Sequence, residues 1–102
     1  MYLVQILLPL NDNTGKQFGN EIFDRIRIDL TERFGGLTAF IRAPATGLWK
    51  NTPGSTMCDE IVIYEVMVES VDRFWWNEYR ERLRNLFQQH KLIIRAESIE
   101  LL

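Results

Sequence analysis

The segment Cys58–Glu69, which reads CDEIVIYEVMVE, has the composition of a central β-strand. It is rich in β-branched and aromatic residues and contains neither glycine nor proline. Because side chains alternate across a strand, the segment has two faces: Val62, Tyr64, Val66 and Val68 on one, and Ile61, Ile63, Glu65 and Met67 on the other. A strand with one face in water alternates between apolar and polar residues. Both faces are mostly apolar here, so we expect this strand to be covered on both sides.

The segments around this strand predict a single α+β domain over residues 1–102. Three of them have strand patterns: Tyr2–Leu8, Leu37–Arg42 and Lys91–Leu102. Two have apolar residues at helical spacing: Asn20–Phe34 and Ser70–Gln89. The element order is therefore β-α-β-β-α-β. With right-handed crossovers, this order predicts a ferredoxin-like sandwich, a four-stranded antiparallel sheet in the order 4-1-3-2 with two helices on one face.

The ends of the helices and the longest link have their own signals. Asn20 is a suitable N-cap for the first helix, and either Ser70 or Asp72 can cap the second. Ala43–Met57 is punctuated by proline and glycine and is too long for a tight hairpin, so we expect a loop. Trp49 lies in the middle of that loop, where it either covers a neighbouring surface or contacts a ligand.

Two helices cover only one face of such a sheet, yet the two central strands have apolar residues on both faces. A continuous exposed apolar patch is unusual on a monomer. The simplest cover for the helix-free face is a second copy of the chain, packed sheet against sheet about a two-fold axis. The sequence therefore predicts a homodimer.

The expected helix-free face also carries a few polar or aromatic side chains among aliphatic ones: Gln5, Phe40, Arg42, Glu65 and Arg95. An apolar surface with a few convergent polar groups is typical of small-molecule sites, so we predict that these residues and Trp49 bind a ligand. Two interpretations of Glu65 stay open. It either pairs with Arg42 or Arg95, within the sheet or across the dimer, and fixes the strand register, or an arginine is free to bind a ligand while Glu65 acts as a catalytic acid or base.

Composition excludes several other classes. The net charge of −2 disfavours nucleic acid, whose binders need a clustered basic face. RNA binding through an open sheet needs aromatic residues on the central strands, where this chain has aliphatic and acidic ones. The single cysteine excludes an internal disulfide and a multi-cysteine metal site. The longest apolar run, Ile6–Leu10, is too short to span a membrane. We therefore expect a cytoplasmic protein with no metal, cofactor, nucleic-acid or membrane partner.

The element order, the length and the two-faced central strands resemble those of the dimeric α/β-barrel proteins. The opening MYLVQILLPL, together with FGGLTAF-x-RAPATGLW, also resembles a small family of uncharacterised bacterial proteins. The first resemblance implies a homodimer; its members include cofactor-free monooxygenases, small-molecule isomerases, haem-handling enzymes and proteins with no assigned activity. None of their catalytic motifs matches this chain residue by residue, so the resemblance implies no catalytic residue, and whether the chain is an enzyme stays open.

Two functions remain after these exclusions. The first is a homodimeric protein that binds or transforms a small polar or anionic aromatic molecule on the helix-free face. The second is a structural or regulatory interaction module without chemistry. A cavity holding Arg42, Glu65 and Arg95 would favour the first function. A tightly packed helix-free face, with exposed apolar residues elsewhere such as Ile28 and Phe74, would favour the second.

Overall fold

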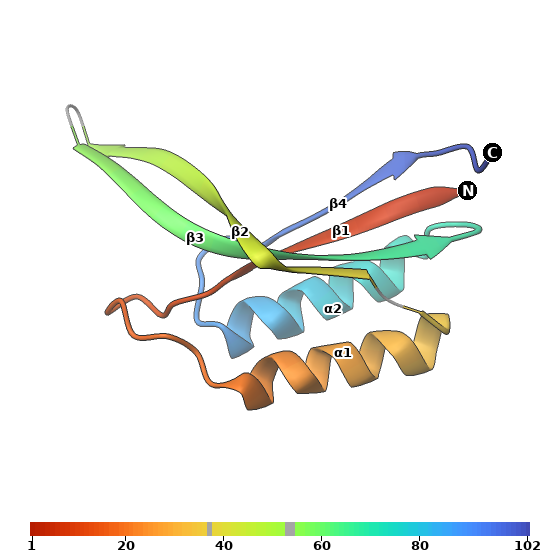
Figure 1. Ribbon diagram of the computed structural model, residues 1–102, viewed down its shortest axis with the longest axis horizontal. Coiled ribbons are helices and arrows are strands. Elements are labelled where there is room, and N and C mark those ends of the chain that lie inside the picture. Colours follow the sequence, from red (N-terminus) through yellow and green to blue (C-terminus); the bar gives the residue numbers. More distant parts are fainter. Residues whose placement is uncertain (37, 53–54) are drawn as a thin grey trace.

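The computed structural model describes the backbone of residues 1–36, 38–52 and 55–102, and the side chains of residues 1–36, 38 and 61–102. Its elements follow the predicted order: β1 Tyr2–Pro9, α1 Asn20–Phe34, β2 Thr38–Thr52, β3 Ser55–Val68, α2 Arg73–Leu86 and β4 Ile93–Ser98. The strands form one antiparallel sheet in the order β2-β3-β1-β4. Both helices lie against the same face of this sheet (Figure 1). The predicted α+β class is therefore confirmed, and β1 and β3 are the central strands.

The core lies between the sheet and the two helices, as the alternation along β3 predicts. The sheet contributes one face of each central strand: Val4, Ile6, Leu8, Val62, Tyr64, Val66 and Val68. The helices and the chain after α2 contribute the residues that pack against it: Phe23, Ile26, Leu30, Trp76, Tyr79, Leu83, Phe87 and Leu92. All of these side chains are buried, whereas Ile28 and Phe74 point away into solvent as predicted. The opposite face of the sheet has no helix on it (Figure 1).

The ends of α1 differ in one respect from the prediction. Its N-cap is Gly19 rather than Asn20, and no side chain of the described residues caps it. At the other end Gly35 takes the left-handed conformation, with φ 78°, and its N–H donates to the Thr31 carbonyl oxygen at 2.8 Å. This left-handed residue ends the helix and turns the chain toward β2.

The predicted range of α2, Ser70–Gln89, is too long at both ends. Asp72 is the N-cap, and its Oδ1 accepts a hydrogen bond from the Trp75 backbone N–H at 3.1 Å, so the helix starts at Arg73. The helix ends before Gln88, whose φ is 53°. Leu86, in the last turn of the helix, is 47% exposed although it is apolar. The last strand is likewise shorter than Lys91–Leu102.

The predicted loop Ala43–Met57 is wrong. β2 and β3 continue to pair through this region, from Ala45 opposite Ile61 to Thr52 opposite Ser55. The register shifts between Phe40 and Ala45. This irregularity accommodates Pro44, which has no N–H for a regular ladder. Residues 45–52 and 55–60 pair only with each other, because the pairing of β1 with β3 stops at Ile61. We call this extension the β2–β3 arm; it projects beyond the rest of the sheet (Figure 1).

Candidate functional site

Three of the predicted site residues lie side by side on the helix-free face. Gln5, on β1, is directly opposite Glu65 on β3 and Arg95 on β4. Arg95 Nε donates to Gln5 Oε1 at 2.8 Å, and Gln5 Nε2 donates to Glu65 Oε2 at 2.5 Å. The three side chains thus form one hydrogen-bonded line across three strands, which we call the polar row.

The Gln5 amide has a defined orientation between the two charges of the polar row. The Gln5 amide turns its oxygen toward the Arg95 guanidinium and its NH₂ group toward the Glu65 carboxylate. Both hydrogen bonds are charge-assisted, and the amide dipole is aligned with both charges, so each bond strengthens the other. Within one chain, Gln5 links Glu65 to Arg95 and the described residues show no direct ion pair between the two, whereas a direct pair across a dimer stays a prediction. Because β1 lies between their strands, their backbones are about 10 Å apart, and Gln5 bridges the gap.

Aliphatic side chains lie on either side of the polar row. Leu3 lies opposite Met67, and Leu7 lies opposite both Ile63 and Ile93. The register also places one charged residue of β4, Glu97, opposite Leu3 on this face. In the single chain the aliphatic side chains are only partly covered, and Met67 and Ile93 are 51% and 36% exposed. The helix-free face thus combines a polar centre with a mostly apolar surround, as the sequence predicts.

A hollow of about 350 Å³ lies beside Glu65, at the end of the polar row. Among the described residues, its lining combines Leu3, Glu65, Val66 and Met67 of the sheet with Thr38 at the start of β2 and Phe34, Gly35 and Gly36 at the end of α1. Pockets for small molecules usually measure about 300–1,000 Å³, so this hollow is at the lower end of that range. Glu65 is the one ionisable side chain in this described lining.

The sequence did not predict the part of this lining that α1 and β2 supply. The relevant signal is the pair Gly35-Gly36, which ends α1, followed closely by Thr38, which pairs with Glu65 in the sheet. The glycine pair indicates a helix end, but only the strand register brings that end beside Glu65. Arg95 does not line this hollow. A cavity that holds Arg42, Glu65 and Arg95 together stays a prediction, because the Arg42 side chain lies outside the described residues.

The other three predicted site residues are Phe40, Arg42 and Trp49, and their side chains lie outside the described residues. Their backbones belong to β2, where Phe40 is opposite Ile63 and Trp49 lies within the β2–β3 arm. The predicted pairing of Glu65 with Arg42, and the predicted ligand contacts of Phe40 and Trp49, therefore stay predictions.

The described residues lack two kinds of feature, a metal-binding cluster and a membrane-spanning helix. They contain no group of three or more His, Cys, Asp or Glu side chains placed to hold a metal ion. Within the same residues, neither helix has the length and hydropathy needed to cross a membrane.

Two solved structures have a similar fold. A phage SAM lyase in complex with S-methyl-5′-thioadenosine matches with a TM-score of 0.59 and 15% identity, over 95% of this chain and 80% of that one. A phage SAM lyase in the apo state matches with the same TM-score and identity, over 94% of this chain and 78% of that one. At this identity the similarity concerns the fold. No family model and no curated protein matches the chain, so the resemblance to an uncharacterised bacterial family stays a prediction.

Proposed function

We propose that this chain is a ferredoxin-like domain that self-associates through its helix-free face and binds a small aromatic molecule beside Glu65. The observation that carries the proposal is the polar row, a single hydrogen-bonded line across a mostly aliphatic face, which leads to the hollow at Glu65. The ligand in this proposal has an aromatic body and an N–H or O–H group.

The exposed surface supports the proposed self-association. The single chain exposes 7370 Å², whereas a compact monomer of this mass exposes about 6,000 Å². Its radius of gyration is 14.4 Å, against about 12.8 Å for a compact domain of this length. The excess area, about 1,300 Å², is larger than the ~800 Å² that each partner buries in a standard interface. The projecting β2–β3 arm contributes to this excess (Figure 1), and a second copy packed on the helix-free face and the arm would remove surface of this order.

The chemistry of the hollow supports ligand binding rather than packing alone. A carboxylate sealed in an apolar interface is costly unless hydrogen bonds satisfy it. Gln5 supplies one such bond to Oε2, and a ligand N–H or O–H would supply another to the same carboxylate. Leu3 and Met67 would contact the ligand body, and thioether sulfur packs favourably against aromatic rings.

A second function, an interaction module without chemistry, is favoured by two observations. Every member of the polar row already has a partner within the row, which is the arrangement expected of a device that fixes strand register. Phe74 is also 76% exposed on the outer side of α2, and Ile28 is exposed on α1. In this alternative, the helix-free face packs tightly and the hollow takes no ligand.

Calorimetric titration separates the two functions. The probes are S-methyl-5′-thioadenosine, the ligand named in one fold neighbour, together with adenosine and tyramine, which combine an aromatic ring with N–H or O–H donors. We expect at least one probe to bind the wild-type chain, and the Glu65→Gln variant to bind it about tenfold more weakly, since a charge-assisted bond is worth about 1.5–3 kcal/mol. The matched control is Glu78→Gln, on the exposed side of α2.

The outcomes are unambiguous. Tighter binding to the wild type and to Glu78→Gln than to Glu65→Gln supports a ligand site beside Glu65. If none of the probes binds, or if the Glu65 variant binds as well as the wild type, the ligand site is wrong and the interaction module becomes the better description. Circular dichroism of each variant confirms that the fold is retained.

A further inference from the structure

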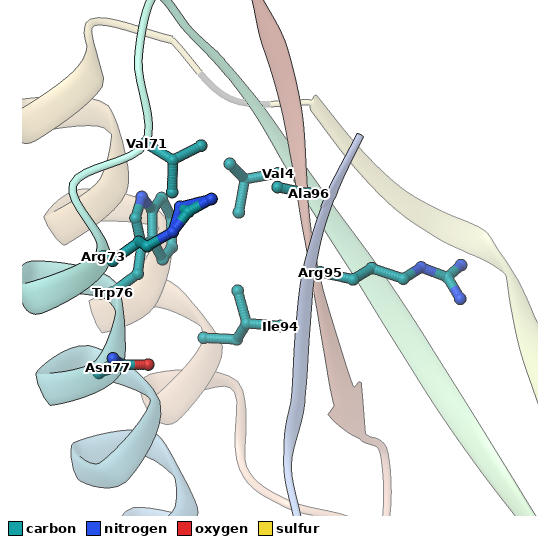
Figure 2. A pocket seen from close by; sticks show the side chains of 8 residues that line it. All are labelled: Val4, Val71, Arg73, Trp76, Asn77, Ile94, Arg95 and Ala96. Atoms are coloured by element: carbon teal, nitrogen blue, oxygen red, sulfur yellow. The ribbon is translucent and has the colours of Figure 1, made fainter. Parts of the chain in front are cut away.

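A groove of about 180 Å³ opens on the other side of the sheet, between α2 and the edge strand β4. Its apolar lining comes from both elements and from β1: Val4, Val71, Trp76, Ile94 and Ala96. Two polar side chains of α2 complete it, Arg73 in the first turn and Asn77 one turn later. Arg95 belongs to the lining as well, but its side chain points away to the helix-free face, where it joins the polar row (Figure 2).

The groove exists because Ala96 is small. Ile94 and Ala96 are the residues of β4 that face the helix layer, and Ala96 lies opposite the buried Val4. Trp76 is buried against the sheet. A longer side chain at position 96 would fill the space between β4 and this ring. Alanine leaves it open, with a largely apolar floor of the kind that binds organic molecules.

Arg73 supplies a cation at the rim of this floor. Its side chain extends from α2 toward the sheet, on the same side as Trp76 (Figure 2). Among the described residues Arg73 forms no ion pair, in contrast to Arg84, which lies 2.8 Å from Glu81. The preceding residue, Asp72, is engaged elsewhere: its Oδ1 accepts from the Trp75 N–H, and its Oδ2 lies 3.8 Å from Arg33.

From this geometry we propose that the groove between α2 and β4 is a binding site for a small carboxylate with a single ring or a short branched chain. The Arg73 guanidinium binds the carboxylate, for which its planar set of donors is suited. Asn77 donates a further hydrogen bond, and Trp76, Val4 and Ile94 contact the ligand body. This site is independent of the proposed function, because it lies on the opposite face of the sheet from Glu65.

The volume of the groove limits the size of the ligand. A cavity of about 150 Å³ accommodates benzene, so about 180 Å³ accommodates one ring whose carboxylate reaches the rim. A nucleoside does not fit this volume, which separates the groove from the larger hollow beside Glu65. For a ligand of this size we expect a Kd on the order of 1 mM or lower.

The probe is benzoate, added to ¹⁵N-labelled wild-type chain in an NMR titration up to about 10 mM, roughly ten times the expected Kd. Benzamide is the neutral control ligand. We expect saturable shifts at the Trp76 indole N–H and the Ala96 amide with benzoate, and at least tenfold weaker binding of benzamide. The Trp76 indole resonance is assigned with the Trp76→Phe variant.

Two variants and one matched control test the residues. Arg73→Gln removes the cation and is expected to weaken benzoate binding at least tenfold. Ala96→Leu fills the groove and is expected to abolish binding without lowering the melting temperature. Arg80→Gln makes the same charge change on the same helix, outside the groove, and is expected to leave binding unchanged.

Saturable binding that Arg73→Gln and Ala96→Leu remove, and that Arg80→Gln retains, supports the site. The absence of saturable shifts in the wild type overturns it. Equal loss of binding in Arg73→Gln and Arg80→Gln also overturns it, because the effect is then one of net charge. Shifts confined to Leu3 and Met67 would instead place benzoate at Glu65 and would likewise contradict the groove site.

Discussion

Gln5 is the residue that connects the two charges of the helix-free face. An apolar residue there would leave Arg95 and Glu65 without a shared partner, on strands separated by β1. Alternation along each strand places all three side chains on one face. Their order within the row depends on the register between strands that are distant in sequence, which no local pattern encodes. The sequence therefore predicts which residues belong to the polar row, but not which side chains within it form hydrogen bonds with each other.

Asp12 provides a test at the scale of one carboxylate. Its Oδ1 accepts hydrogen bonds from the Thr14 hydroxyl at 2.6 Å and from the Thr14 and Lys16 backbone N–H groups at 2.9 Å. These bonds, the hydroxyl above all, hold the pKa of Asp12 below its ordinary value of 3.8. A lowered pKa means that Asp12 stabilises the folded state above pH 3.8 and loses this contribution as the pH falls through the folded value.

We therefore expect Asp12→Asn to lower the free energy of unfolding at pH 7, and this effect to decrease steadily as the pH is lowered below 3.8. Urea denaturation of both chains at each pH measures the difference. A difference that does not change with pH would show that the charge of Asp12 contributes nothing through these bonds.

Substitution of Tyr79 tests the energetic cost of a buried hydroxyl that has no hydrogen-bond partner among the described residues. Its side chain is buried, its ring stacks on Trp75 at 4.8 Å, and its hydroxyl has no hydrogen-bond partner among the described residues. Burial raises the pKa of Tyr79, so the group stays protonated. Tyr79→Phe removes a buried hydroxyl that makes no hydrogen bond among the described residues. We therefore expect the free energy of unfolding to rise by up to about 1 kcal/mol, as measured by urea denaturation.

Tyr64→Phe is the matched control, because Tyr64 is similarly buried and its hydroxyl, unlike that of Tyr79, is not among the buried groups without a partner. We expect the free energy of unfolding of Tyr64→Phe, measured by urea denaturation, to be about 1 kcal/mol lower than that of the wild type. If Tyr79→Phe were the less stable of the two variants, the hydroxyl of Tyr79 would have a partner after all.

At the scale of elements, the chain after α1 turns on Gly35. The residue has φ 78°, a conformation that costs an alanine about 1–2 kcal/mol. Gly36 follows without a positive φ, and an added Cβ would meet nothing within 4 Å at either glycine. The two positions therefore differ in backbone conformation but not in the room available for a Cβ atom.

We expect Gly35→Ala to lower the free energy of unfolding by about 1 kcal/mol, and Gly36→Ala to leave it unchanged or raise it slightly. Thermal and urea denaturation of the pair measure the difference. Equal effects of the two substitutions would mean that the left-handed conformation does not determine the stability of this helix end.

The elements also show where sequence patterns fail. The central turns of each helix follow from apolar spacing, but the N-cap of α1 is Gly19 rather than Asn20, and no described side chain bonds there to mark the start. The region 43–57 contains Pro44 and Gly47, which favour a loop in any local analysis. The paired arm depends on hydrogen bonds between β2 and β3 and on a register shift that accommodates Pro44, both of which are non-local. The hollow beside Glu65 was missed for the same reason, since it needs α1, β2 and β3 together.

At the scale of the whole molecule, the helix-free face is the surface through which we propose that two copies associate. Ile93 and Phe74 have comparable apolar character, but Ile93 lies on the helix-free face and Phe74 on the outer side of α2. Lysine is tolerated on an edge strand such as β4. Lysine substitutions at Ile93 and at Phe74 therefore distinguish an effect on the proposed interface from an effect elsewhere on the surface.

We expect light scattering of the wild-type chain to give at least twice the monomer mass, Ile93→Lys to shift the population toward monomer, and Phe74→Lys to leave the mass unchanged. The reason is that a lysine ammonium in the proposed sheet-to-sheet interface would be desolvated without a partner. A monomeric wild type, or a larger effect of Phe74→Lys, would contradict self-association through this face.

The two chain ends meet at one corner of the sheet, where the Ile99 N–H donates to the Met1 carbonyl oxygen at 3.0 Å (Figure 1). β4 and β1 are neighbours in space but stand at opposite ends of the sequence, so their pairing closes almost the whole chain. A circular permutant that joins the ends through a short glycine linker and opens the exposed bend at Glu69–Ser70 turns this pair into a hairpin. Its contact order falls, so stopped-flow refolding of the permutant should be faster than that of the natural connectivity.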